Sequence, residues 1–208
     1  MGYKLAVVGA TGNVGREMLR IIEERGFPVD EIVALASERS AGKQVSFGDE
    51  TILDVQDLEK FKFKGIDIVL SSPGAKVSAT FAPRAARAGA IVIDNTSQFR
   101  MDPEVPLVVP EVNAESIERY KNRNIISNPN CSTIQLVVAL KPLHDAFNIR
   151  RVVVATYQSV SGSGKGAMDE LFEQTRNIFI NGELKKEHFT NGQTIWVEGC
   201  EASSVAEL

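Results

Sequence analysis

Residues 5–15 read LAVVGATGNVG, and this stretch decides the fold. The run Leu5–Val8 is short and apolar, which is typical of a buried strand. Three glycines follow at a spacing of three, and from Val14 onward apolar residues recur at helical spacing. A buried strand, a glycine-rich turn and a helix in this order predict the first βα unit of a parallel sheet.

The rest of the chain continues to alternate between strand and helix. Further apolar runs predict strands at 32–36, 66–70, 90–94, 107–109 and 125–127. Helices are predicted at 77–88 and 132–147, and a third helix is predicted after the Gly/Ser loop at 161–164, ending at about Ile178. The β-branched run Arg151–Tyr157 predicts one more strand. We therefore predict an α/β fold: a doubly wound parallel sheet of the Rossmann type, followed by an incomplete second α+β domain.

Three segments follow from this pattern. Residues 1–128 form the first domain, and residues 129–190 form the start of the second. The tail at 191–208 has no clear period, and we interpret it as divergent.

Composition and charge exclude several classes of protein. The net charge of -4 and the lack of a Lys/Arg run argue against a nucleic-acid partner. No apolar stretch approaches the length of a membrane span, and the first residues lack the features of a signal peptide. Two cysteines, Cys131 and Cys200, are too few for a disulfide framework. A reducing, cytoplasmic setting without a metal site is the expectation.

The glycine loop has the features of a dinucleotide-binding turn. Gly9 permits a tight turn, Gly12 lets the backbone approach a pyrophosphate, and Gly15 lets the helix pack close to the sheet. The helix N-terminus presents N–H groups and its positive dipole end to the phosphates. The cofactor-binding residues predicted here are Gly9, Thr11, Gly12, Asn13, Val14 and Gly15. The alternative is a plain β–α turn that is rich in glycine.

A second polar segment follows the strand at 32–36, where the ribose of a dinucleotide is recognised. Glu38 favours the 2′-hydroxyl of NAD, whereas Arg39 favours the 2′-phosphate of NADP. Ser37 and Ser40 flank the pair and tip the balance, because hydroxyls and a guanidinium together suit a phosphate. NADP is therefore the predicted cofactor, although Glu38 can equally be read as part of a solvated polar loop.

Cys131 lies between a strand end and a predicted helix, in the run Asn128-Pro129-Asn130-Cys131-Ser132-Thr133. A thiolate at a helix N-terminus is stabilised by the helix dipole and by N–H groups, which makes it an attacking nucleophile. The same donors can hold an oxyanion. Most free cysteines are buried structural residues, but the polar neighbours argue against burial here.

Taken together, these motifs resemble the aspartate-semialdehyde dehydrogenase family. The resemblance covers about residues 3–190. It rests on five segments, which are Gly9–Gly15, Ala36–Gly42, Asp94–Arg100, Asn128–Thr133 and Gln158–Lys165. The resemblance implies the reversible reductive dephosphorylation of L-aspartyl-4-phosphate to L-aspartate 4-semialdehyde, with NADP as the cofactor and phosphate as a product. It also implies that the protein assembles as a homodimer. It also implies a place in the biosynthesis of lysine, diaminopimelate, methionine and threonine.

The resemblance also implies roles for single residues. Cys131 is the acylated nucleophile, with Asn130 beside it to position substrate and phosphate. Arg100 binds phosphate and Gln158 orients the substrate, although from the residues alone Arg100 is equally a surface arginine and Gln158 a strand-end residue without a task. The loop residues implied at the nicotinamide end of the cofactor are Ser161, Gly162 and Gly164.

The chain also departs from the family. A histidine base, a carboxylate-binding arginine and a further phosphate-site lysine have no match, because His144 fits a helix end and His188 lies in a charge run. We interpret the chain as truncated, and expect the 208 residues to bind NADP without measurable turnover. The alternatives are therefore a catalytically inactive NADP-binding relative and, less favoured, an N-acetylglutamyl-phosphate reductase, in which we expect different neighbours around the cysteine.

Overall fold

The computed structural model describes residues 2–49 and 51–181, and the chain forms two compact units. The first unit spans Met1–Ser159 and the second Val160–Leu208. Each unit is described by itself. The predicted domain boundary after residue 128 stays a prediction, and the predicted tail at 191–208, His188 and Cys200 lie outside the described residues.

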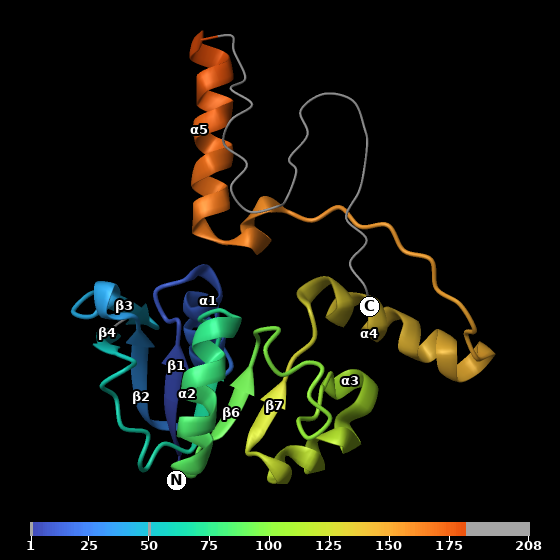
Figure 1. Ribbon diagram of the computed structural model, residues 1–208, viewed down its shortest axis with the longest axis horizontal. Helices are drawn as coiled ribbons and strands as arrows, with labels where there is room; N and C mark the ends of the chain where they lie inside the picture. The colour runs from blue at the N-terminus through green and yellow to red at the C-terminus, as the bar shows by residue number, and fades with distance from the viewer. Residues whose placement is uncertain (1, 50, 182–208) are drawn as a thin grey trace. The chain divides into compact units, whose positions relative to one another are not determined.

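A seven-stranded sheet forms the centre of the first unit (Figure 1). Its strands are β1 Tyr3–Val8, β2 Val29–Ala36, β3 Gln44–Phe47, β4 Thr51–Asp57, β5 Ile68–Ser71, β6 Ile91–Asp94 and β7 Ile125–Ser127. The strand order is β3-β4-β2-β1-β5-β6-β7, and every neighbouring pair is parallel except β3 with β4. The predicted Rossmann-type α/β sheet is therefore confirmed, with one antiparallel strand at its edge.

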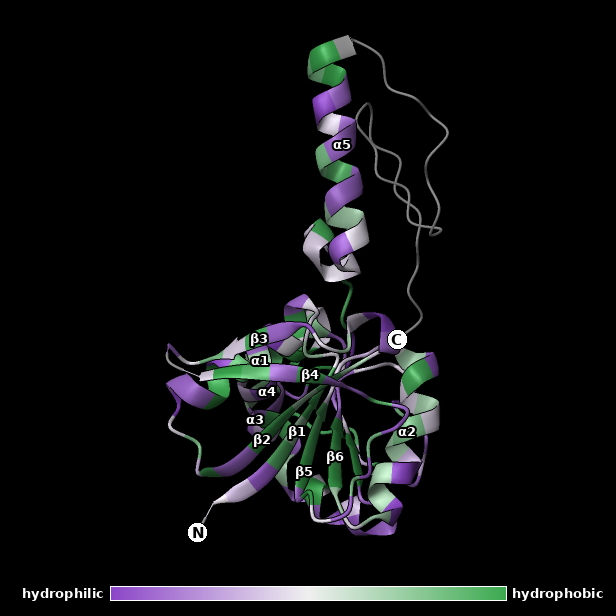
Figure 2. Cartoon of the chain, turned by 90° about the vertical axis from the view of Figure 1, so that its left-hand side faces the viewer, coloured by the Kyte–Doolittle hydropathy of each residue, from purple (hydrophilic) through white to green (hydrophobic). Residues whose placement is uncertain are grey.

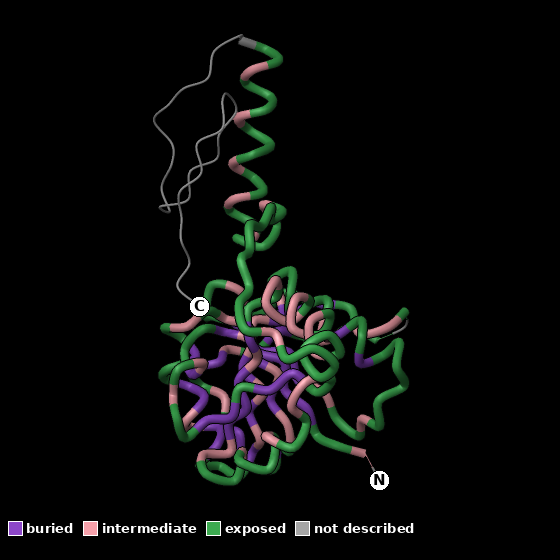
Figure 3. The backbone as a smooth tube through the Cα atoms, turned by 90° about the vertical axis from the view of Figure 1, so that its right-hand side faces the viewer, coloured by how far each residue is buried: buried purple, intermediate pink, exposed green. Residues whose placement is uncertain are grey.

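Alternating side chains build a core on each face of the sheet. On one face Leu5 and Val7 of β1 pack with Leu19 and Ile22 of helix α1, Asn13–Glu24. On the other face Ala6 and Val8 belong to the cluster that holds the buried side of helix α2, Ala75–Arg87. Figure 2 shows the two helices on opposite sides of hydrophobic strands, and Figure 3 shows the buried segments gathered in the interior of the first unit. The central strands are apolar on both faces for this reason.

The chain reverses direction across the sheet next to β1. From β1 it passes through α1 to β2 on one side, and after β4 it returns to β5 on the other side. In such sheets ligands bind outside the carboxyl ends of the strands, where the order reverses. The fold therefore places the loops after β1, β2 and β5 at one edge.

Shorter helical segments and a long helix complete the first unit. They are η1 Glu38–Ser40, α3 Pro110–Asn113, η2 Ala114–Asn122 and α4 Cys131–Phe147. The second unit holds η3 Val160–Ser163 and α5 Lys165–Asn181. No helix among the described residues is long and apolar enough to cross a membrane.

Three parts of the prediction need correction. The predicted strand at 107–109 was wrong, because only Leu107 pairs, in an isolated bridge with Ser127. The hairpin β3–β4 was not predicted, because polar residues interrupt its apolar positions, such as Val45 and Val55. The predicted strand Arg151–Tyr157 was wrong: these residues have no regular structure, and Val153 is 81% exposed. A β-branched run forms a strand only when another strand pairs with it, and no described strand does so here.

Candidate functional site

The glycine loop turns tightly around its first residue. Gly9 has a φ of 82°, and its N–H donates to the carbonyl of Leu35 at 2.9 Å. A Cβ on Gly9 would lie 2.9 Å from the carbonyl oxygen of Ser72, and one on Gly15 would lie 2.2 Å from that of Gly9. Gly9 therefore serves the turn and Gly15 the close packing of α1 against the loop, which are the roles that the motif predicts.

Gly12 has a different position. It is exposed, and it is the N-cap of α1 without any capping side chain. No acidic residue occupies the first turn of α1, so the positive end of the helix is not neutralised there. Together, these features leave the backbone open to an anion at the start of the helix.

A cavity of about 490 Å³ lies beside this loop. It is lined by residues from the loops after four parallel strands, together with the start of α2, namely Gly9, Thr11, Gly12, Ala36, Ser37, Glu38, Arg39, Leu58, Glu59, Ser72, Pro73 and Val77. Five of the predicted cofactor residues are brought together here, while Asn13, Val14, Gly15 and Ser40 do not line the cavity. Its size suits a small ligand or part of a dinucleotide.

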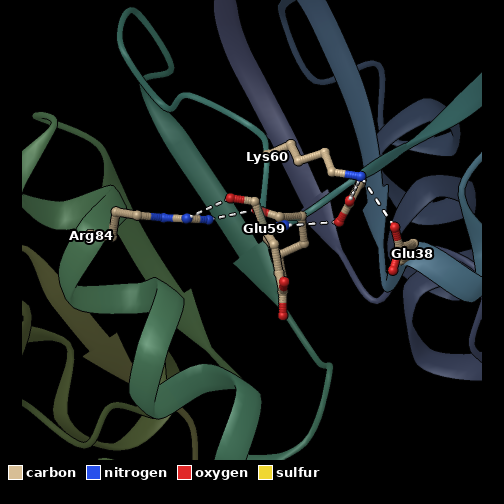
Figure 4. Close-up of polar contacts among 6 residues, drawn as sticks. Glu38, Glu59, Lys60 and Arg84 are labelled. Atoms are coloured by element: carbon tan, nitrogen blue, oxygen red, sulfur yellow. Dashed lines mark hydrogen bonds and ion pairs between the residues drawn. The ribbon is translucent and has the colours of Figure 1, made fainter.

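Glu38 and Arg39 line the same cavity but differ in their surroundings. Glu38 is paired with Lys60, whose Nζ lies 3.2 Å from Glu38 Oε1 and 3.1 Å from Asp57 Oδ2 (Figure 4). Hydrogen bonds to Asp57 and then to Glu38 raise the pKa of Lys60 above its usual value. The N–H of Glu59, and then Lys60, hold the pKa of Asp57 below its usual value.

A buried carboxylate organises the loop that follows β6. Asp94 is fully buried and accepts hydrogen bonds from Ser71 Oγ at 2.9 Å and from Thr96 Oγ1 at 2.7 Å. The N–H of Thr96 also donates to it at 3.2 Å. These bonds join the ends of β5 and β6 and fix the start of the predicted Asp94–Arg100 segment.

Arg100 joins this loop to the cysteine turn. Its Nε donates to the carbonyl of Asn128 at 2.9 Å and its Nη2 to the carbonyl of Asn95 at 3.1 Å. Asn128 in turn donates its N–H to the carbonyl of Asp94 at 2.9 Å. Arg100 is therefore not a free surface arginine, since two of its nitrogens hold the turn that leads to Cys131.

Cys131 is the first residue of α4 and is exposed. Asn130 is the N-cap, and its Oδ1 accepts from the N–H of Ser132 at 2.9 Å. The thiol Sγ lies 3.9 Å from the same oxygen. The predicted placement of the thiol at a helix N-terminus is confirmed, and the cap fixes the Asn130 amide beside the sulfur.

The glycine loop and the cysteine lie at the same edge of the sheet. Both follow the carboxyl ends of parallel strands, β1 and β7, which are three strand spacings apart. At about 4.8 Å for each spacing, roughly 14 Å separates the two strand ends. The Asn95–Arg100 loop follows β6, which lies between these two strands in the sheet.

The remaining predicted residues belong to other segments of the chain. Gln158 is exposed in a segment without regular structure. Ser161, Gly162 and Gly164 belong to the second unit, where the N–H of Gly164 donates to the carbonyl of Ser161 at 3.0 Å. His144 lies exposed in the last turn of α4, as its sequence position predicts.

Several lining residues escaped the sequence analysis. Ser72 and Pro73 follow a buried strand beside the first one, so a search of every strand end would have found them. Leu58 and Glu59 follow β4, which was not predicted. Lys60 carries no signal of its own, because its link to Glu38 spans 22 positions.

Comparison with known proteins identifies two matching domain families. Residues 4–120 match the family described as semialdehyde dehydrogenase, NAD binding domain, and residues 140–195 match its dimerisation domain. The chain is 56% identical over 187 residues to the aspartate-semialdehyde dehydrogenase of Aquifex aeolicus, covering 89% of this chain and 55% of that protein. It spans about half the length of the curated relatives that it matches.

Solved structures agree with this match. Aspartate semialdehyde dehydrogenase II of Vibrio cholerae, complexed with ASA, superposes with a TM-score of 0.84 and 54% identity, covering 86% of this chain and 53% of that one. The enzyme of Candida albicans with NADP gives a TM-score of 0.59 and 31% identity, covering 72% and 48%.

Proposed function

This chain belongs to the semialdehyde dehydrogenase family, and from that premise we propose that it carries the NADP site and the nucleophile of an aspartate-semialdehyde dehydrogenase. The proposed reaction is the reversible reductive dephosphorylation of L-aspartyl-4-phosphate to L-aspartate 4-semialdehyde. It would serve lysine, diaminopimelate, methionine and threonine biosynthesis in the cytoplasm. One observation carries the proposal: a glycine-lined cavity and a cysteine at the start of a helix share the carboxyl edge of one sheet.

The cavity fits the dinucleotide on structural grounds. The exposed position of Gly12, which has no side chain, and the uncapped start of α1 suit a pyrophosphate, and Ser37 and Arg39 suit a 2′-phosphate. When bound, NADPH would supply the hydride that reduces the acyl group. The NADP-bound relative from Candida albicans supports this choice of cofactor.

Cys131 would perform the acyl transfer. Its thiolate attacks the carbonyl carbon of the acyl phosphate, an S–C bond forms, and the C–O bond to phosphate breaks as phosphate leaves with the electron pair. N–H groups at the start of α4 lie where they can stabilise the charge that develops on the carbonyl oxygen. Asn130 is held by the N–H of Ser132 and would position the substrate beside the sulfur.

Arg100 would receive the phosphate group. Its Nε and Nη2 are engaged by backbone carbonyls, and no partner among the described residues is recorded for Nη1. A guanidinium fixed in this way presents its remaining donor without a further entropic cost. Gln158 would orient the substrate, and Ser161, Gly162 and Gly164 would close on the nicotinamide. These last roles are supported by the family resemblance.

The assembly and the turnover of the chain are further parts of the proposal. The match of residues 140–195 to a dimerisation domain supports a homodimer. That the 208-residue chain alone does not turn over stays a prediction. It is checked by NADPH formation from semialdehyde, phosphate and NADP, beside Cys131→Ala. Activity well above that variant would show that the unmatched base and arginine are not needed.

Arg39→Ala is expected to remove the preference for NADPH over NADH. The substitution deletes a charge-assisted hydrogen bond to the 2′-phosphate, worth about 1.5–3 kcal/mol, which corresponds to roughly a tenfold to hundredfold change in affinity. Fluorescence titration of both cofactors into the 208-residue chain measures the effect. Arg25→Ala, at the opposite end of α1, is the matched control and should bind as the unmodified chain does. Equal affinities for the two cofactors in the unmodified chain would contradict the NADP assignment.

A further inference from the structure

Lys60 is an unexpected neighbour of the proposed ribose site. Its ammonium bridges two carboxylates, Glu38 at 3.2 Å and Asp57 at 3.1 Å. Glu38 lines the cavity, whereas the Asp57 side chain is 11% exposed. One lysine from the loop after β4 therefore reaches the loop after β2 and pairs with the acidic residue that lines the cavity.

The segment that carries Lys60 is held by backbone contacts (Figure 4). The N–H of Leu58 donates to the carbonyl of Ala36 at 2.9 Å, which ties it to the end of β2. Arg84 of α2 donates from Nη1 to the carbonyl of Glu59 at 2.8 Å and from Nη2 to that of Leu58 at 2.5 Å. The Arg84 guanidinium also stacks over Phe63, 5.6 Å from the ring centre. These contacts fix the backbone on which the Lys60 side chain stands, independently of its ion pairs.

The pairing matters because Glu38 and Arg39 favour different cofactors. An acidic residue at the end of the second strand accepts hydrogen bonds from a ribose 2′-hydroxyl and repels a 2′-phosphate. A cation within hydrogen-bond distance of Glu38 offsets that repulsion and competes for the oxygens that a hydroxyl would use. Arg39 forms no ion pair with another described residue. Its positive charge then dominates the electrostatic environment of the 2′-phosphate.

We propose that Lys60 is a positioning residue that favours NADP by pairing with Glu38 and offsetting part of its negative charge. The inference rests on the proposed function, because it requires the cavity to be the dinucleotide site. Lys60 acts through the carboxylate and makes no contact with the ligand itself.

Titration of NADPH and NADH into variants of the 208-residue chain tests the proposal. Lys60→Gln should lower the ratio of NADPH to NADH affinity about fivefold, the upper range for an exposed charge pair. Lys62→Gln, an exposed lysine two positions along, is the matched control and should leave the ratio unchanged. Adding Glu38→Gln to Lys60→Gln should return the ratio to its original value or above, because the unpaired carboxylate is removed.

The outcomes separate the possible roles. If Lys60 had only a structural role, its loss would weaken the binding of both cofactors equally, as we expect for Arg84→Met. An unchanged ratio of NADPH to NADH affinity in Lys60→Gln would overturn the proposal. A ratio that stays low in the double variant would also overturn it, since Lys60 would then contact the phosphate directly. If the unmodified chain binds both cofactors equally, the NADP assignment fails, yet the Lys60→Gln shift is still expected. If it binds neither cofactor, the dinucleotide site and the inference fail together.

Discussion

Gly15→Ala is expected to lower the free energy of unfolding of the first unit by about 3 kcal/mol, or to prevent its folding. The new Cβ would lie 2.2 Å from the carbonyl oxygen of Gly9 and 2.7 Å from the Cα of Ala10. Both are backbone atoms, so no change of rotamer relieves the overlap, and either α1 or the loop after β1 must move. Urea unfolding followed by circular dichroism measures the loss.

Two other glycines are matched controls for this change. A Cβ on Gly12 would lie 3.3 Å from the Gly9 oxygen, and one on Gly166 would meet nothing within 4 Å. Gly12→Ala should therefore unfold close to the unmodified chain but bind NADPH more weakly, because its methyl group stands at the proposed pyrophosphate position. Gly166→Ala should leave both properties unchanged. A Gly15→Ala chain as stable as these two would contradict the close packing described for α1.

Cys131→Ser is expected to slow phosphate release from L-aspartyl-4-phosphate by about 10³-fold or more. Serine keeps the size and the helix start but replaces the sulfur nucleophile by a hydroxyl oxygen, which is a much weaker nucleophile. Stability should stay near that of the unmodified chain, because Cys131 is exposed and its side chain fills no core position. The measurement is the rate at which each chain releases phosphate, after subtraction of the rate of uncatalysed hydrolysis.

Ser132→Ala is the control for the cysteine substitution. Asn130 caps the helix through the backbone N–H of Ser132, and alanine retains that group. Its rate of phosphate release should therefore match that of the unmodified chain. Equal rates in Cys131→Ser and Ser132→Ala would remove the thiol from the proposed mechanism.

The parts of the fold that sequence could predict are those with a strong periodic signal. The strand Leu5–Val8, its glycine loop and the helix that follows were predicted, because burial on both faces requires an apolar run and only glycine fits the contacts at positions 9 and 15. The β3–β4 hairpin was missed, since polar residues interrupt its apolar positions and leave no long apolar run. The strand at Arg151–Tyr157 was wrong for the opposite reason: propensity without a pairing partner does not specify a strand.

The parts of the candidate site that sequence could predict are those that depend on neighbouring residues. Cys131 and its cap are local features, so neighbouring residues were sufficient to place the thiol at a helix start. The clamp by Arg100 and the pairing of Lys60 with Glu38 depend on residues 28 and 22 positions apart, which only the folded sheet brings together. Gln158 and the loop at Ser161–Gly164 stay predictions, because their roles rest on the family resemblance alone.

The site of acylation tests most directly the claim that this sheet edge binds an acyl phosphate and transfers its acyl group to the thiol. The 208-residue chain would be mixed with freshly prepared L-aspartyl-4-phosphate, quenched in acid and digested, and its peptides weighed by mass spectrometry. We predict one added aspartyl group on the peptide that contains Cys131, removable by hydroxylamine as a thioester should be, and absent in Cys131→Ser. An adduct spread over other peptides, or one that persists in Cys131→Ser, would contradict the account.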